Sequence, residues 1–288
     1  MIVPRWEPQP DVWLLVATVA GGYVWAIRRL GPERVPPEQP VVTRGQAWSF
    51  GLAVATLWVA LDWPIDPLSD HYLLSVHMFQ HLLLMLVAPP LFLLGLPAWL
   101  LRVLLRPRWF RAVARQVTRP VVALVFFNAI IVLTHWPNWV NLTLESEPFH
   151  FFSHFLLFSS AMCMWWPVIS PLPEMPTLSY PGRMLYLFLQ SIVPTVPASF
   201  LTFGSTPLYH FYTTVPRIWG MSVITDQRVA GLEMKLLGGA ILFTVMAVVF
   251  FRWFGQEQRT EGWDALEWGR VDRQLRSDAP PKDGLAVR

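Results

Sequence analysis

Charged residues and cysteine are scarce in this chain. Asp, Glu, Lys and Arg make up only 14% of its 288 residues, and Cys163 is its single cysteine. Soluble domains carry about 25% charged residues, so the composition excludes an ordinary soluble enzyme. A lone cysteine also excludes an intramolecular disulfide. The sequence contains no internal repeat and no glycine-rich loop of the kind that binds phosphate.

Hydrophobic residues are abundant instead, at 54% of the chain, and 16 residues are tryptophan. A helix that rises about 1.5 Å per residue needs roughly 20 apolar residues to cross about 30 Å of hydrocarbon. Seven apolar runs approach that length, at residues 11–28, 45–61, 73–96, 120–136, 148–168, 184–203 and 229–251. The sequence therefore predicts an all-α fold, a bundle of seven transmembrane helices in a polytopic protein whose partner is the lipid bilayer.

These spans account for most of the chain. Residues 1–251 are predicted to form the seven-span transmembrane domain, and residues 252–288 a cytoplasmic tail. The tail holds seven acidic and seven basic residues, and from Asp278 onward its prolines and charges are typical of disorder, so we expect it to be partly disordered. Residues 1–11 lack the basic segment and cleavage site of a signal peptide, which predicts that the first span is retained as an anchor.

Basic residues are distributed unevenly between the connections. Eighteen of the 22 Lys and Arg residues lie in every second connection between the spans or in the C-terminal tail. Four lie at 28–44, six at 102–119, one at Arg183 and seven beyond residue 251. Lys and Arg near span ends are retained on the cytoplasmic side, so we expect the N-terminus outside and the C-terminus in the cytoplasm. The net charge of +3 then reflects topology, and no nucleic acid is expected as a partner.

All seven histidines fall toward the predicted outer face. His77 and His81 are four residues apart, as are His150 and His154, so each pair lies on one face of its helix. A polar ring without a partner is costly inside hydrocarbon, and both pairs are therefore predicted to point inward. Four imidazoles on the third and fifth spans form a candidate metal site.

The residues near these pairs favour copper as the ion. Imidazole binds copper, zinc, iron and nickel, whereas thioether sulfur prefers Cu(I). Met85 and Met162 continue the two histidine faces, although methionine is more often a filler of gaps in a core. Asp226 opens the last span and Met234 follows it by eight residues on the same face, so we expect them to complete or orient the site. The predicted metal residues are His77, His81, His150, His154, Asp226 and Met234.

Two further carboxylates precede the third span. Asp66 and Asp70 lie in a segment that is predicted to be a loop, and we interpret both as solvated charges. Asp62 lies nearer the second span, and the sequence leaves open whether it is a solvated charge or a partner of the metal site.

Three ordered motifs resemble the CtaG family of cytochrome c oxidase assembly factors. They are His77-Met-Phe-Gln-His81 followed by Pro89-Pro90, His150-Phe-Phe-Ser-His154 leading to Trp165-Trp166-Pro167, and Asp226-Gln227 followed by Gly231. The resemblance implies a multi-pass protein of the bacterial cell (plasma) membrane that is not an enzyme. Its implied role is to deliver copper to a cytochrome c oxidase subunit or to another copper carrier.

The residues leave two other functions open. Two histidines on neighbouring helices ligate the iron of a b-type haem, and a Soret band would favour that alternative. Glu233 and Lys235 lie within the last span, where charge is costly, and they are compatible with a copper or ion transporter. This charged pair departs from the family pattern, in which we expect an aromatic residue near Lys235.

Overall fold

The structure is a computed structural model that describes residue 6 and residues 8–277, and beyond residue 259 it gives the side chains of residues 270 and 274 only. Every regular element within these residues is helical, which confirms the all-α prediction. In chain order the elements are α1 (Pro10–Arg29), α2 (Arg44–Leu61), α3 (Ile65–His71), α4 (Leu74–Leu82), the π-helix η1 (Leu83–Val87), α5 (Ala88–Gly95), α6 (Ala98–Leu104), α7 (Arg108–Val117), α8 (Pro120–Thr134), α9 (Pro137–Glu145), α10 (Glu147–Ile169), α11 (Tyr180–Phe203), α12 (Phe211–Thr214) and α13 (Val223–Ser277).

Six helical stretches of the described chain are long and apolar enough to cross a membrane. The predicted run at 120–136 forms α8, whose 15 residues span only about 22 Å at 1.5 Å per residue. Helix α8 follows α7 at a bend of 79°, and this pair counted as one broken span makes the seventh. The prediction of a polytopic helical bundle is confirmed, with the fourth span shorter than expected and joined to a surface helix.

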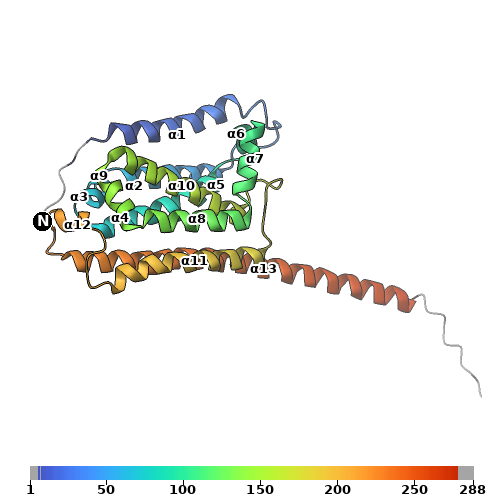
Figure 1. The fold of residues 1–288 in the computed structure, drawn as a ribbon. Helices are drawn as coiled ribbons and strands as arrows, with labels where there is room; N and C mark the ends of the chain where they lie inside the picture. Colours follow the sequence, from blue (N-terminus) through green and yellow to red (C-terminus); the bar gives the residue numbers. More distant parts are fainter. Residues whose placement is uncertain (1–5, 7, 278–288) are drawn as a thin grey trace, which may run out of the picture.

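The helices are arranged around two central spans. Helix α1 lies along one side of the bundle, α11 and α13 lie side by side along the opposite side, and α2, α4, α5, α8 and α10 run between them (Figure 1). In the most apolar stretch of the 74–95 span 67% of residues are buried, and in that of α10 56% are. The other four of the six candidate spans bury 28% or less. The two spans that carry the histidine pairs are therefore the ones best shielded from lipid.

A π-helical turn divides the first of these central spans. Pro89 has no N–H, so the carbonyl of Met85 lacks the donor that a regular helix would provide four residues later. The indole Nε1 of Trp165 on α10 donates to that carbonyl over 2.9 Å. Below the histidines this span is thus locally widened and is tied to α10 by the Trp165 indole.

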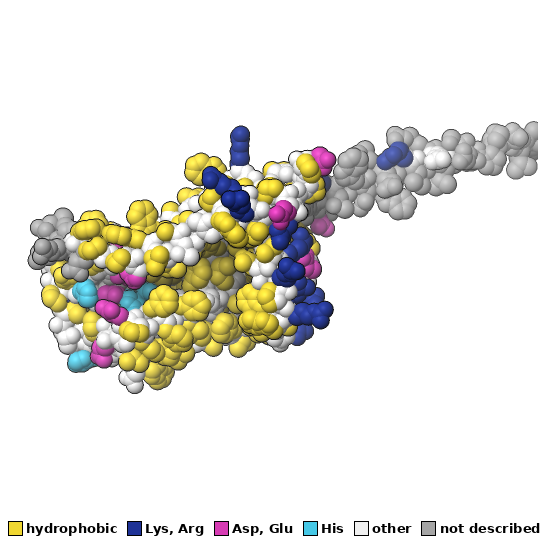
Figure 2. Space-filling view, turned by 90° about the horizontal axis from the view of Figure 1, so that it is seen from above, with side chains coloured by type: hydrophobic (Ala, Val, Ile, Leu, Met, Phe, Trp, Pro, Cys, Tyr) yellow, Lys and Arg dark blue, Asp and Glu magenta, His cyan; other side chains and the backbone are white. Residues whose placement is uncertain are grey.

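The two ends of the bundle differ in chemistry. Short helices α3, α9 and α12 gather at one end, and α6 and α7 lie at the other (Figure 1). Figure 2 shows Lys and Arg side chains at the end from which α13 emerges, histidine with acidic side chains at the opposite end, and an apolar band between. At the basic end Arg102 Nε lies 2.7 Å from Glu174 Oε1 and lowers the pKa of that carboxyl. Both side chains are half exposed, so the ion pair adds little stability.

The predicted tail is helical over most of its length. Helix α13 continues without a break from the last span to Ser277, well past residue 251. The segment predicted to be disordered, from Asp278, lies outside the described residues.

Candidate metal centre

His77 and His81 are positioned by the start of helix α4. No side chain of α4 or of the residue before it caps this helix. Instead, the carboxylate of Asp226 accepts hydrogen bonds from the backbone N–H groups of Leu74 and Ser75, both over 2.9 Å. Capping the positive end of a helix with a carboxylate stabilises it, so the first turn of α13 fixes the turn of α4 from which His77 projects.

Asp226 is itself fully buried and paired with a cation. Arg217 Nη2 donates to its Oδ2 over 3.1 Å. In the described part of the chain Asp226 belongs to neither group of side chains whose atoms are close enough to share an ion. Asp226 was expected either to complete the metal site or to orient it. In the structure it supports α4 and so orients the site.

His150 and His154 on α10 face the α4 pair. Their ring centroids are 4.2 Å apart, with 3.2 Å between the two Nε2 atoms. The ring of His154 lies 5.4 Å from that of His81 and 6.0 Å from that of His77. The four histidines that were predicted to meet between the third and fifth spans do form one cluster.

Two overlapping groups in this cluster have the spacing of ion ligands. In the first, potential ligand atoms of His77, His81 and His154 all lie within 4.8 Å of one another. The second group, with the same spacing, consists of Asp70, His77 and His150. Ligands bonded to copper or zinc at about 2.0–2.1 Å lie roughly 3.3–3.6 Å apart, so small ring rotations would close either group. We call them the inner triad and the outer triad, and His77 belongs to both.

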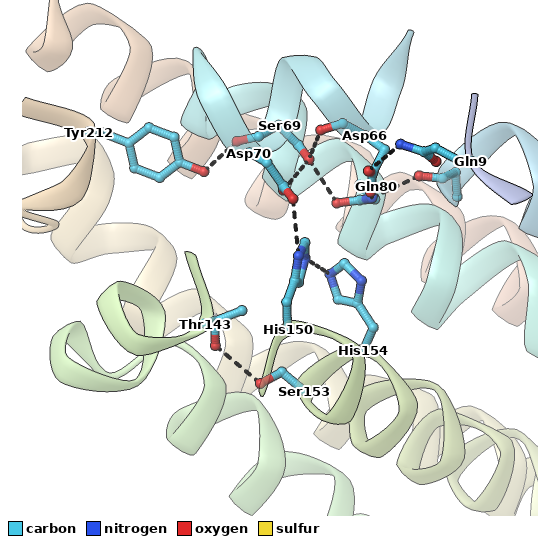
Figure 3. Close-up of polar contacts among 11 residues, drawn as sticks. Gln9, Asp66, Ser69, Asp70, Gln80, Thr143, His150, Ser153, His154 and Tyr212 are labelled. Carbon is cyan, nitrogen blue, oxygen red and sulfur yellow. Dashed lines mark hydrogen bonds and ion pairs between the residues drawn. The ribbon is translucent and has the colours of Figure 1, made fainter. Parts of the chain in front are cut away.

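Asp66 and Asp70 were wrongly interpreted as solvated charges. The segment before α4 is not an open loop but the short helix α3, which packs against α4 and turns both carboxylates toward the centre. Asp70 Oδ2 accepts from His150 Nδ1 over 3.0 Å, and Asp66 accepts from Gln80 and Gln9 (Figure 3). Ser69 joins the two parts of this network because its hydroxyl contacts Asp70 and Gln80. Asp62 accepts from the indoles of Trp13 and Trp58.

His135 is a fifth member of the cluster that the sequence did not single out. It follows the last residue of α8, and its ring lies 5.7 Å from that of His81. Its Nδ1 is 2.8 Å from the carbonyl oxygen of Ile131. A carbonyl only accepts, so Nδ1 carries the proton and Nε2 presents its lone pair. Histidines that bind metals commonly donate their second N–H to a carbonyl in this way. His71 and His210 are exposed and stand outside the cluster.

Three imidazole nitrogens of the cluster are buried without a hydrogen-bond partner among the described residues. They are Nδ1 of His77, Nδ1 of His81 and Nε2 of His135. The residues themselves are only 1%, 5% and 4% exposed. Buried polar atoms in native proteins nearly always have a partner. Three such orphaned donors or acceptors in one cluster are typical of a place that receives a ligand.

Met234 lies on the inner side of the histidines. It lines a cavity of about 290 Å³ together with Met78, Met85, Met164, His81 and His135. Met162, which was predicted to continue the α10 histidine face, instead packs in the apolar core. Helical periodicity alone could not tell that Met234 lines the cavity whereas Met162 packs in the core, because each lies on the inward face of its helix.

A bundle of membrane-spanning helices that gathers five histidines at one end, four of them buried, defines a multi-pass membrane protein with a candidate metal centre. The chain belongs to the family of cytochrome c oxidase caa3 assembly factors (Caa3_CtaG), whose family model matches residues 21–256. The family is described by a role in assembly of cytochrome c oxidase.

The matched curated relatives are much longer than this chain. Uncharacterized proteins of Mycobacterium bovis and Mycobacterium tuberculosis are each 28% identical to it over 261 residues, which cover 82% of this chain. The chain spans only 38% of the length of either relative. No solved structure matches the chain.

Proposed function

We propose that this protein binds copper as a cargo at the histidine centre and passes it to a cytochrome c oxidase subunit or another copper carrier during oxidase assembly. The observation that carries the proposal is the pair of triads that share His77. Imidazole is a good ligand for copper in either oxidation state, and the methionine thioethers beneath the histidines favour Cu(I) over divalent zinc, iron or nickel. Holding and releasing an ion needs no chemical turnover.

The proposed location of the protein is the cell membrane of a bacterium, with the histidine end of the bundle on the outer face. Asp70 and His150 are the more exposed members of the centre, with 20% and 13% of their side chains accessible. His77 is almost fully buried. An ion arriving from outside would therefore meet the outer triad first and reach the inner triad through the shared ligand His77.

The space among the histidines favours an ion over haem. A cavity of about 10 Å³ lies against His77, His81, Thr134 and Ser153. That is about the volume needed for one water molecule, whereas a porphyrin needs room for a macrocycle between its two axial ligands. A Soret band in the purified protein would nevertheless overturn this preference directly.

The direct test is the copper content of the purified protein. His77→Ala and His154→Ala each remove a member of the inner triad, and we expect either change to abolish most of the bound copper. His71→Ala and His210→Ala are matched controls, because these exposed histidines lie outside the cluster. Unchanged copper in the first pair would overturn the proposal. In cells, normal copper loading of the oxidase without this protein would limit its role to assembly without metal delivery.

A further inference from the structure

The cavity beneath the histidines has an unusual lining. Four of the ten methionines of the chain surround it: Met78 on α4, Met85 on η1, Met164 on α10 and Met234 on α13. None is more than 8% exposed. We call this space the methionine cavity. These methionines come from four elements, so their presence around one cavity depends on the folding of the whole bundle.

Two histidines also line this cavity, and each has a ring nitrogen without a hydrogen-bond partner among the described residues. His81 and His135 both contact the methionine cavity. Nδ1 of His81 and Nε2 of His135 are buried without a hydrogen-bond partner among the described residues. Because the Nδ1 proton of His135 is committed to the Ile131 carbonyl, its Nε2 is available only as an acceptor or a metal ligand.

His81 connects the cavity to the inner triad. It belongs to that triad, and it also lines the methionine cavity. The polar groups therefore change in order along the bundle, from the carboxylate of Asp70 through the imidazoles to the thioethers. Met85 lies eight residues after His77, about 12 Å deeper along the span. Met78 lies level with the histidines, and Met85 extends the sulfur groups to greater depth, where soft ligands favour Cu(I).

We propose that the methionine cavity is a second Cu(I) site, which receives the ion from the inner triad through His81 and holds it with His135 and the thioethers. This inference depends on the copper-binding function proposed above. Methionine has three rotatable side-chain bonds, so the sulfur atoms have the freedom to close on an ion in a cavity that is larger than the ion. The site would store the ion deeper in the bundle, where the cavity reaches the surface beside the exposed Lys235 and Phe243.

The test is X-ray absorption spectroscopy of the purified full-length protein loaded anaerobically with Cu(I). We expect a copper population with sulfur neighbours in addition to one with nitrogen neighbours. The double variant Met164→Leu with Met234→Leu removes two of the four thioethers, so it should reduce the number of sulfur neighbours and keep the nitrogen-bound copper. Met162→Leu with Met246→Leu is the matched control, since it changes the same two helices at methionines outside the cavity. Exchanges between Met and Leu conserve volume and are usually tolerated.

A single variant keeps the test decisive if the double variant does not fold. His135→Asn retains a donor for the Ile131 carbonyl and removes the Nε2 ligand, so it should weaken the sulfur-bound population and spare the nitrogen-bound one. Wild-type protein that binds Cu(I) with nitrogen neighbours only would overturn the second site and leave the histidine site standing. Protein that binds no Cu(I) at all would overturn both proposals, and an unchanged number of sulfur neighbours in the Met164→Leu, Met234→Leu variant would overturn this one.

Discussion

At the scale of single residues, Asp70 provides a negative charge beside the buried histidines. Its carboxylate accepts from Nδ1 of His150 and from the Ser69 hydroxyl, and it also belongs to the outer triad. A carboxylate that accepts from one imidazole nitrogen fixes the ring and leaves the other nitrogen free to bind an ion. His150 Nε2 accordingly faces His154 and not solvent.

Neutralising Asp70 should weaken copper binding. Asp70→Asn removes the negative charge of the outer triad and the strong acceptor for His150, and outer partners of this kind contribute about 10–100-fold to metal affinity. The measurement is a competition titration of the purified protein against a chromophoric Cu(I) chelator. Asp66→Asn is the control, because the Asp66 carboxylate accepts hydrogen bonds from Gln80 and Gln9, whereas His150 donates to Asp70. Equal affinities for Asp70→Asn and wild type would make Asp70 a structural acceptor only.

At the scale of helices, the amino-acid pattern accounts for the spans and for the two histidine faces. Hydrophobic runs report the lipid-crossing segments because length and polarity are local properties, and a spacing of four places His77 with His81 on one face. Helix α3 was missed because it is short and is stabilised by contacts to α4, through Ser69 and Gln80. His135 was missed because a lone histidine carries no spacing, and only the packing of α8 brings it to His81. Asp226 illustrates the same limit, since its cap on α4 joins residues about 150 positions apart.

Close helix packing makes a second prediction at this scale. A Cβ added at Gly231 of α13 would lie 2.7 Å from the carbonyl oxygen of Ala198 and 2.8 Å from the backbone N of Thr202, both on α11. Backbone atoms yield little, so Gly231→Ala should push α13 from α11 and destabilise the protein by about 1–3 kcal/mol, the usual cost of overpacking. A thermal melt in detergent should show the lower midpoint.

Gly239 on the same helix provides the control. Nothing lies within 4 Å of a Cβ placed there, so Gly239→Ala should leave the midpoint unchanged or raise it, because Ala favours a helix over Gly by about 0.8–1.0 kcal/mol. Equal melting midpoints for the two variants would contradict the packing of α13 against α11.

At the scale of the whole molecule, the two ends of the bundle carry opposite chemistry. Basic side chains gather at the end where α13 leaves the bundle, and the histidines and their acidic partners lie at the other end (Figure 2). Because Lys and Arg near span ends are retained in the cytoplasm, we expect the centre to face the outside of the cell. A copper site that opens outward would collect its ion without the ion having crossed the membrane.

This orientation predicts which end reacts with a reagent that does not cross the membrane. In a background of Cys163→Ala, which removes the native thiol, His210→Cys places a thiol on an exposed residue of the histidine end. Glu33→Cys places one at the basic end, where the native side chain is 74% exposed. A charged maleimide added to intact cells should label His210→Cys at once and Glu33→Cys only after the membrane is permeabilised. The reverse pattern would turn the histidine centre toward the cytoplasm, and copper would then have to reach it from cytoplasmic carriers.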